Sequence, residues 1–182
     1  MDNQIKEIAE RLRGLREVLE LSPAEFAQQA GIDEQEYEKV ELGESDISVS
    51  MLQKISRKFK VSLDELMFGL EPRMSNYFLT RNGKGISIER TKAYKYQSLA
   101  SGFKGRLVDP FLVTVEPNNE SITLNQHPGQ EFNLVVKGSL LIRIDEKDLI
   151  LNPGDSLYFN ANLRHGMKAL NDEQAQFIAI II

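Results

Sequence analysis

The sequence has 182 residues, no cysteine and only two histidines. The absence of cysteine excludes disulfides, thiolate metal sites and cysteine nucleophiles, and it is compatible with a reducing compartment. No apolar run approaches the roughly 20 residues that cross a bilayer, and the acidic start MDNQIKEIAE is unlike a signal peptide. We therefore expect a cytoplasmic protein with no membrane partner, stabilised by packing alone.

Charge divides the chain into three segments. Residues 1–70 carry 9 basic and 15 acidic side chains, residues 71–110 carry 8 and 3, and residues 111–182 carry 5 and 9. The hydrophobic pattern changes at the same places, from a helical period to short alternating segments punctuated by Gly, Pro and Asn. This predicts a multidomain chain, α followed by β, with a boundary near residues 69–74.

The first 68 residues have the pattern of five helices. Apolar side chains recur at steps of three and four from Ile5 to Leu19, which predicts a long amphipathic helix that ends near Leu21. A second helix is expected from its capping serine and first-turn proline to residue 29 or 30, where Gly31 ends it. The second and third helices are expected to be capped by Ser22 and Asp33, a fourth helix is predicted over residues 48–59, and a short fifth over residues 62–67.

The segments LSPAEFAQQAGIDEQEYEKVELGES and ISVSMLQKISRKFKVSLDELM resemble the Cro/repressor-type helix-turn-helix family, also called the XRE family. The resemblance covers residues 5–68. It rests on the Leu-Ser helix start, the Ala and Gly at the turn, the Glu-x-Gly after the third helix and the Val-Ser-Leu-Asp-Glu-Leu ending. It implies a five-helix bundle whose third helix enters the major groove of DNA.

The resemblance implies a DNA-binding surface at the start of the second helix and along the third, made by Ser22, Pro23, Glu34, Gln35, Glu36, Lys39 and Ser45. Phosphate neutralisation needs Lys or Arg, yet most of the solvent-facing positions expected on the third helix are glutamates, namely Glu34, Glu36, Glu38 and Glu41. Only Gln35 and Lys39 resemble common base or phosphate contacts. The family also commonly has Gln where Pro23 stands.

Basic side chains on other helices are a second possible source of phosphate contacts. They are Arg11, Arg13 and Arg16 on the first helix, and Lys54, Arg57, Lys58 and Lys60 on the fourth. The alternative is that they form solvated faces that balance nearby acidic groups. Both interpretations are open from the sequence.

Residues 69–107 are predicted to be a basic linker with the first β segments. Strand alternation would place Arg90, Lys92, Tyr94 and Tyr96 on one face. If this face lines the mouth of a barrel it could bind an anion, and Tyr94 and Tyr96 are then candidates for a ligand pocket. The alternative is an edge strand protected by charge.

Residues 108–182 are predicted to form an all-β domain, because short β segments alternate with turns. The segments are FLVTVEP, SITLNQH, EFNLVVKGSLLIRID, DLILNPGDSLYFN and AQFIAIII. We expect the last of these to be an edge strand or a dimer contact, because exposed terminal isoleucines favour aggregation.

Both histidines lie in this β-rich region, His127 in HPGQE and His165 after NPGD. With Glu131 they provide two imidazoles and one carboxylate, a ligand set for a divalent first-row metal with open coordination positions. The alternative is a metal-free site in which the histidines bind an organic ligand or fill the core.

The HPGQE segment and the later NPGD turn followed by histidine resemble the two motifs of the cupin family, over residues 108–182. The resemblance implies a β-barrel (double-stranded β-helix) that holds Fe, Zn, Mn or Ni. The implied metal ligands are His127, Glu131 and His165, with Asn125 where the family has its first histidine. The expected ligand pocket consists of Tyr94, Tyr96, Phe132 and Tyr158.

Two functions follow from the combined resemblance. The chain resembles transcriptional regulators in which a small-molecule effector in a cupin domain shifts the relative placement of two DNA-binding heads in a homodimer. It also resembles iron-dependent oxidases of the hydroxypropylphosphonate epoxidase type, in which the helical domain need not touch DNA. The regulator is the preferred prediction because such fusions are numerous.

Overall fold

The computed structural model describes residues 3–45, 47–91 and 94–182, and the chain divides into two compact units, residues 1–72 and 73–182. Lys92, one of the residues predicted on the basic strand, lies outside the described residues. None of the described helices is long and apolar enough to cross a membrane.

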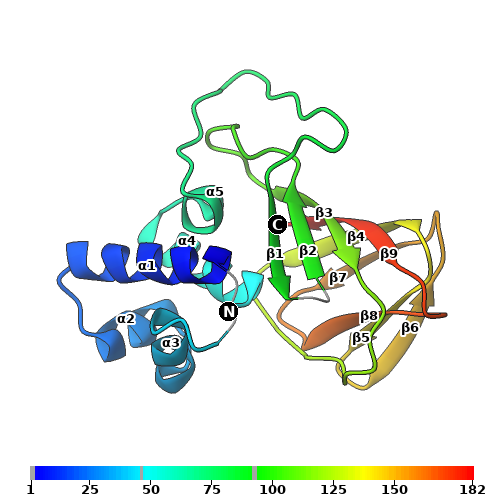
Figure 1. Ribbon diagram of the computed structural model, residues 1–182, viewed down its shortest axis with the longest axis horizontal. Coiled ribbons are helices and arrows are strands. Elements are labelled where there is room, and N and C mark those ends of the chain that lie inside the picture. The colour runs from blue at the N-terminus through cyan, green and yellow to red at the C-terminus, as the bar shows by residue number, and fades with distance from the viewer. Residues whose placement is uncertain (1–2, 46, 92–93) are drawn as a thin grey trace. The chain divides into compact units, whose positions relative to one another are not determined.

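The first unit contains the five predicted helices (Figure 1). Its helices are α1 (Asn3–Val18), α2 (Pro23–Ala30), α3 (Glu34–Glu41), α4 (Val49–Phe59) and α5 (Leu63–Phe68). The two expected capping residues, Ser22 and Asp33, are confirmed, since each accepts a hydrogen bond from the backbone N–H three residues later. Ser48 and Ser62 cap α4 and α5 in the same way. The Gly31 stop is also confirmed, with a left-handed φ of 66°.

The predicted end of the first helix was wrong by three residues. Helix α1 ends at Val18, and the chain turns at Glu20, whose φ is 56°. The N–H of Leu21 then donates to the carbonyl of Arg16 at 3.2 Å, which closes the helix end. Val18 is 81% exposed and Leu19 is 40% exposed, so the last part of the apolar pattern does not reach the core.

Aromatic rings form the centre of the helical unit. Phe26 of α2 stacks on Tyr37 of α3 at 4.9 Å and on Phe59 of α4 at 4.4 Å between ring centroids. Phe26 and Tyr37 are fully buried, as is Leu52 of α4. This packing orients α3 relative to α2, the arrangement that a helix-turn-helix needs.

The second unit contains two antiparallel sheets (Figure 1). The six-stranded sheet has the order β1-β2-β3-β9-β4-β7, and the three-stranded sheet has the order β6-β5-β8. The strands are β1 (Ser87–Thr91), β2 (Tyr94–Ser98), β3 (Asp109–Val115), β4 (Gln130–Lys137), β5 (Leu140–Ile144), β6 (Lys147–Leu151), β7 (Ser156–Asn160), β8 (His165–Ala169) and β9 (Ala175–Ile181).

Three strand predictions need correction. The single strand expected around residues 90–96 is a hairpin of β1 and β2, and SITLNQH is not a strand but joins β8 through one bridge at Asn125. The apolar end AQFIAIII is not an edge strand, because β9 lies in the middle of the large sheet between β3 and β4. Its alternate side chains, from Ala175 to Ile181, are buried, and those between them are half-buried.

Candidate metal centre and helix-turn-helix surface

Two strands and the segment before β4 bring the three predicted metal ligands together. Glu131 lies near the start of β4, His165 begins β8, and His127 lies three residues before β4. Glu131 Oε2 is 3.2 Å from His127 Nε2 and 3.6 Å from His165 Nε2. All three side chains are buried, and their candidate ligand atoms lie within 4.8 Å of one another.

The two distances from Glu131 are close to those between ligands of one metal ion. Metal–ligand bonds of about 2.1 Å place neighbouring ligand atoms about 3.0–3.5 Å apart in octahedral or tetrahedral geometry. The other ring nitrogens face backbone carbonyls, His127 Nδ1 at 3.3 Å from Pro128 O and His165 Nδ1 at 2.8 Å from Leu163 O. In the tautomer that donates from Nδ1 to these carbonyls, the lone pair of Nε2 faces the cluster and can bind a metal.

Electrostatics at His165 favour the neutral imidazole that metals bind. Burial lowers the pKa of His165, and the nearby His127 ring lowers it further, although the Leu163 carbonyl and the charge of Glu131 act in the opposite direction. A neutral ring needs to release no proton from Nε2 when a metal binds.

Backbone hydrogen bonds to His165 hold Asn125 beside this cluster. The N–H and carbonyl of Asn125 exchange hydrogen bonds with those of His165, both at 2.8 Å. The adjoining Gly166 allows this close approach, because a Cβ there would lie 2.4 Å from the carbonyl oxygen of Thr123. Whether the Asn125 amide is a fourth ligand stays a prediction.

The predicted ligand pocket is corrected at two of its four positions. Phe132 and Tyr158 are cross-strand partners on the face opposite Glu131, with ring centroids 6.4 Å apart. Tyr158 is 54% exposed, and its hydroxyl donates to Gln130. Strand alternation explains the error, since the neighbour of an inward residue must face outward.

Tyr94 and Tyr96 of β2 remain on the inward face. They pair in register with buried residues of β3, Val115 and Val113 respectively. The Tyr94 hydroxyl donates to the carbonyl of Met167 on β8 at 2.9 Å, so this side chain spans from one sheet to the other. Both rings are half-buried.

Asn133 is an inward-facing residue that sequence reasoning missed. It follows Glu131 by two positions on β4 and is 1% exposed. The same period of two that predicts the strand also predicts that Asn133 shares the face of Glu131. The alternation along β4 could therefore have identified Asn133 from the sequence.

On the helix-turn-helix unit, α3 presents an acidic exposed face. Glu34, Gln35, Glu36, Glu38 and Lys39 are exposed, as the sequence predicts. At the start of α2, the exposed Ser22 forms a capping box with Glu25, and Pro23 is half-buried. Ser45 is half-buried, and its N–H donates to the carbonyl of Lys39 at 3.3 Å.

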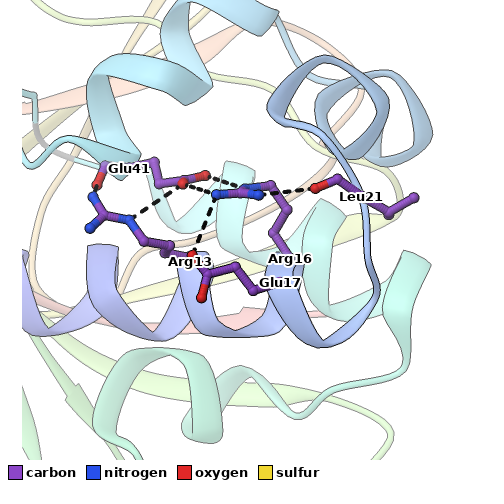
Figure 2. A network of polar contacts seen from close by, with 5 residues as sticks. All are labelled: Arg13, Arg16, Glu17, Leu21 and Glu41. Atoms are coloured by element: carbon purple, nitrogen blue, oxygen red, sulfur yellow. Dashed lines mark hydrogen bonds and ion pairs between the residues drawn. The ribbon is translucent and has the colours of Figure 1, made fainter.

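Glu41 was predicted to face solvent, but it is 7% exposed (Figure 2). It lies four residues after the buried Tyr37, on the inward side of α3. Arg16 Nε donates to Glu41 Oε2 at 2.9 Å, Arg16 Nη2 donates to Glu41 Oε1, and Arg13 Nη2 donates to the Glu41 carbonyl at 2.8 Å. Arg16 also donates to the carbonyl of Leu21 at 3.0 Å.

This network shifts the pKa values of its members. Burial acts to raise the pKa of Glu41, but the hydrogen bonds from Arg16 and the charges of Arg16 and Arg13 outweigh it, so the pKa is lowered. The hydrogen bond to Glu41 raises the pKa of Arg16. Burial raises the pKa of the Tyr37 hydroxyl, with a further contribution from Glu41.

The arginines of α1 are therefore engaged within the unit. Besides Arg13 and Arg16, Arg11 donates to the carbonyls of Leu66 and Met67 at the end of α5, both at 2.8 Å. These contacts satisfy carbonyls at helix ends. Exposed basic side chains of this unit include Lys39 on α3 and Lys58 on α4.

Comparison with known families and structures agrees with this geometry. The helix-turn-helix family matches residues 5–66, and the cupin domain family matches residues 111–181. No curated protein matches the chain.

Solved structures share the whole fold at low sequence identity. An HTH_3 family transcriptional regulator from Vibrio cholerae is 22% identical, with a TM-score of 0.68 over 98% of this chain and 96% of that one. Hydroxypropylphosphonic acid epoxidase from S. wedmorenis is 20% identical, with a TM-score of 0.53 over 100% of both chains. A structure of FeII HppE is 20% identical, with a TM-score of 0.54 over 99% of this chain and 100% of that one. The chain therefore contains a helix-turn-helix domain at residues 5–66 and a cupin domain at residues 111–181.

Proposed function

We propose that the chain is a cytoplasmic, DNA-binding transcriptional regulator whose cupin domain holds a divalent metal and a small-molecule effector. The observation that carries the proposal is the presence, in one chain, of a helix-turn-helix domain and a cupin domain with a buried cluster of His127, Glu131 and His165. A homodimer is the expected assembly, because helix-turn-helix domains usually read two half-sites.

The exposed face of α3 would read bases more than it binds phosphates. Gln35 can pair with adenine, Lys39 with guanine or a phosphate, and Glu34 or Glu36 can accept a hydrogen bond from the amino group of cytosine. Because few cations are available, few counterions would be released on binding, and affinity would depend only weakly on salt. Non-specific binding would be weak for the same reason.

In the cupin domain, His127 and His165 would hold the metal through Nε2, and Glu131 through its carboxylate. The bound metal would supply open coordination positions for an oxygen or nitrogen atom of the effector. An effector changes DNA affinity only by binding differently to the free and DNA-bound forms, so the coupling between the two sites is measurable as a shift in Kd.

An iron-dependent oxidase or epoxidase-like enzyme is the second candidate. It is favoured by the composition of the cluster, two histidines and one carboxylate, which suits non-haem Fe(II) with open positions. The internal engagement of Arg11, Arg13 and Arg16 also favours it, since a helical domain with fewer free cations has less need of DNA.

One purified sample distinguishes the two functions. Metal content is measured for iron, zinc, manganese and nickel, and binding to the upstream DNA of its own gene is measured across a salt series. The regulator predicts DNA binding that weakens in Lys39→Ala, stays unchanged in the control Lys147→Ala of the exposed β6, and changes when an effector is added. Iron without DNA binding would support the enzyme and refute the regulator.

A further inference from the structure

The barrel contains a polar side chain whose hydrogen-bonding capacity is not met. Among the described residues, no hydrogen-bond partner reaches Asn133 Oδ1, although the residue is 1% exposed. A buried polar atom without a hydrogen-bond partner destabilises the folded chain. Asn133 lies on the same face of β4 as Glu131, two positions further along the strand.

The neighbours of Asn133 are apolar. In the register of the sheet it lies between Ala179 of β9 and Leu157 of β7, and Phe111 of β3 lies beyond Ala179. Ala179 and Phe111 are buried, and neither side chain can donate a hydrogen bond.

We propose that Asn133 binds the hydroxyl end of an organic ligand whose other end coordinates the metal. The inference rests on the proposed metal site of His127, Glu131 and His165. A divalent ion and one carboxylate leave a net charge of +1, which favours an anionic oxygen donor such as a carboxylate. Asn133 Oδ1 accepts only, so the distal group is a donor.

The spacing sets the length of this ligand. Positions i and i+2 of a strand are about 7 Å apart. A carboxylate on the metal side and a hydroxyl at Asn133 are therefore joined by a short aliphatic chain, which the apolar neighbours accommodate. The ligand class is the short ω-hydroxy carboxylic acids.

The test compares two acids with equal numbers of heavy atoms, 4-hydroxybutanoate and pentanoate, which differ by a hydroxyl in place of a methyl. Binding to the Co(II)-loaded full chain is measured by calorimetry. We expect 4-hydroxybutanoate to bind about 5- to 30-fold more tightly, the range of one buried hydrogen bond. In Asn133→Leu and in Asn133→Ala the two acids bind equally, while Co(II) affinity is retained.

Thr114→Val is the matched control. Thr114 is also a buried polar residue of the sheet, but its Oγ1 accepts a hydrogen bond from Gln176 at 3.1 Å and lies on the face opposite Val113. This variant is expected to lose stability and to keep the preference for 4-hydroxybutanoate. Ligand-free Asn133→Leu is expected to melt at the same or a higher temperature, since it removes an unsatisfied polar group.

The outcomes separate this inference from the function on which it rests. A chain that binds no Co(II) overturns the metal site and the inference together. Co(II) binding with equal affinity for the two acids, or with affinity for neither, overturns the role of Asn133 and leaves the metal site intact. Discrimination that survives in both Asn133 variants also overturns it.

Discussion

Glu41→Gln tests the account of how α3 is held in place. The change keeps the volume of the side chain and removes the charge that Arg16 and Arg13 contact. The positive charges of the two guanidinium groups then face a neutral amide, which cannot neutralise them. The Glu41 side chain is 9% exposed and that of Arg16 is 14%, so solvent replaces the lost interaction poorly.

The expected loss can be bounded. A charge pair about 4 Å apart is worth about 4 kcal/mol at an effective dielectric constant of 20. Removing one partner of a fully buried pair costs about 3–5 kcal/mol. Arg13 is 44% exposed and contributes less, so we expect Glu41→Gln to lower the free energy of unfolding of the helical unit by about 2–4 kcal/mol.

Hydrogen exchange of peptides that span α3 and α1 measures this loss locally in the full chain. Glu38→Gln is the control, since it makes the same chemical change at an exposed position of the same helix and should cost less than about 0.5 kcal/mol. Equal exchange in the two variants would refute the structural role of Glu41.

The pH dependence has a definite sign. The pKa of Glu41 is lowered in the folded chain, so its contribution is present above the pKa of an unfolded glutamate, about 4.3, and is lost as pH falls through the folded value. Stability of the helical unit in the unmodified chain should therefore fall below about pH 4.3 by more than in Glu41→Gln.

Three further predictions concern the remaining parts of the chain. Gly166→Ala should lower Co(II) affinity at least about tenfold, as measured by calorimetry, because its Cβ would displace the Thr123 backbone that lies against β8. Tyr158→Phe should leave the affinities for Co(II) and for the carboxylic acids unchanged, since the ring lies on the outer face. An altered affinity would show that Tyr158 contributes to the ligand pocket after all. Asp33→Ala should lower the free energy of unfolding of the helical unit by about 1 kcal/mol, because it removes the cap hydrogen bond to the Glu36 N–H. Hydrogen exchange of the Glu36 amide should then be faster, and unchanged exchange would contradict the cap.

Local chemistry made the helices predictable. Caps such as Ser22 and Asp33 depend on hydrogen bonds within three residues, so sequence spacing determines them. The position of Glu41 depends instead on Arg16, 25 residues away, and no local pattern distinguishes a paired glutamate from an exposed one. For the same reason, the hydrogen bonds of the α1 arginines to residues of α3 and α5 could not be predicted from local sequence patterns.

In the β-rich unit, the meeting of His127, Glu131 and His165 was predictable from motif spacing, but two pocket residues were not placed on the correct face. The inward position of Glu131 determines that Phe132 points outward and Asn133 inward, and applying this alternation would have corrected both. The place of β9 could not come from alternation, because a strand's position in a sheet depends on its partners, β3 and β4.

The most direct test of the proposed function is selection of bound sequences from a random duplex DNA library by the metal-loaded full chain. The account predicts enrichment of two related half-sites with centres about 10 base pairs apart, or a multiple of that spacing. It also predicts that Gln35→Ala relaxes the preference at one position of each half-site while Lys147→Ala does not. No enrichment by a chain that is folded and carries its metal would contradict the account.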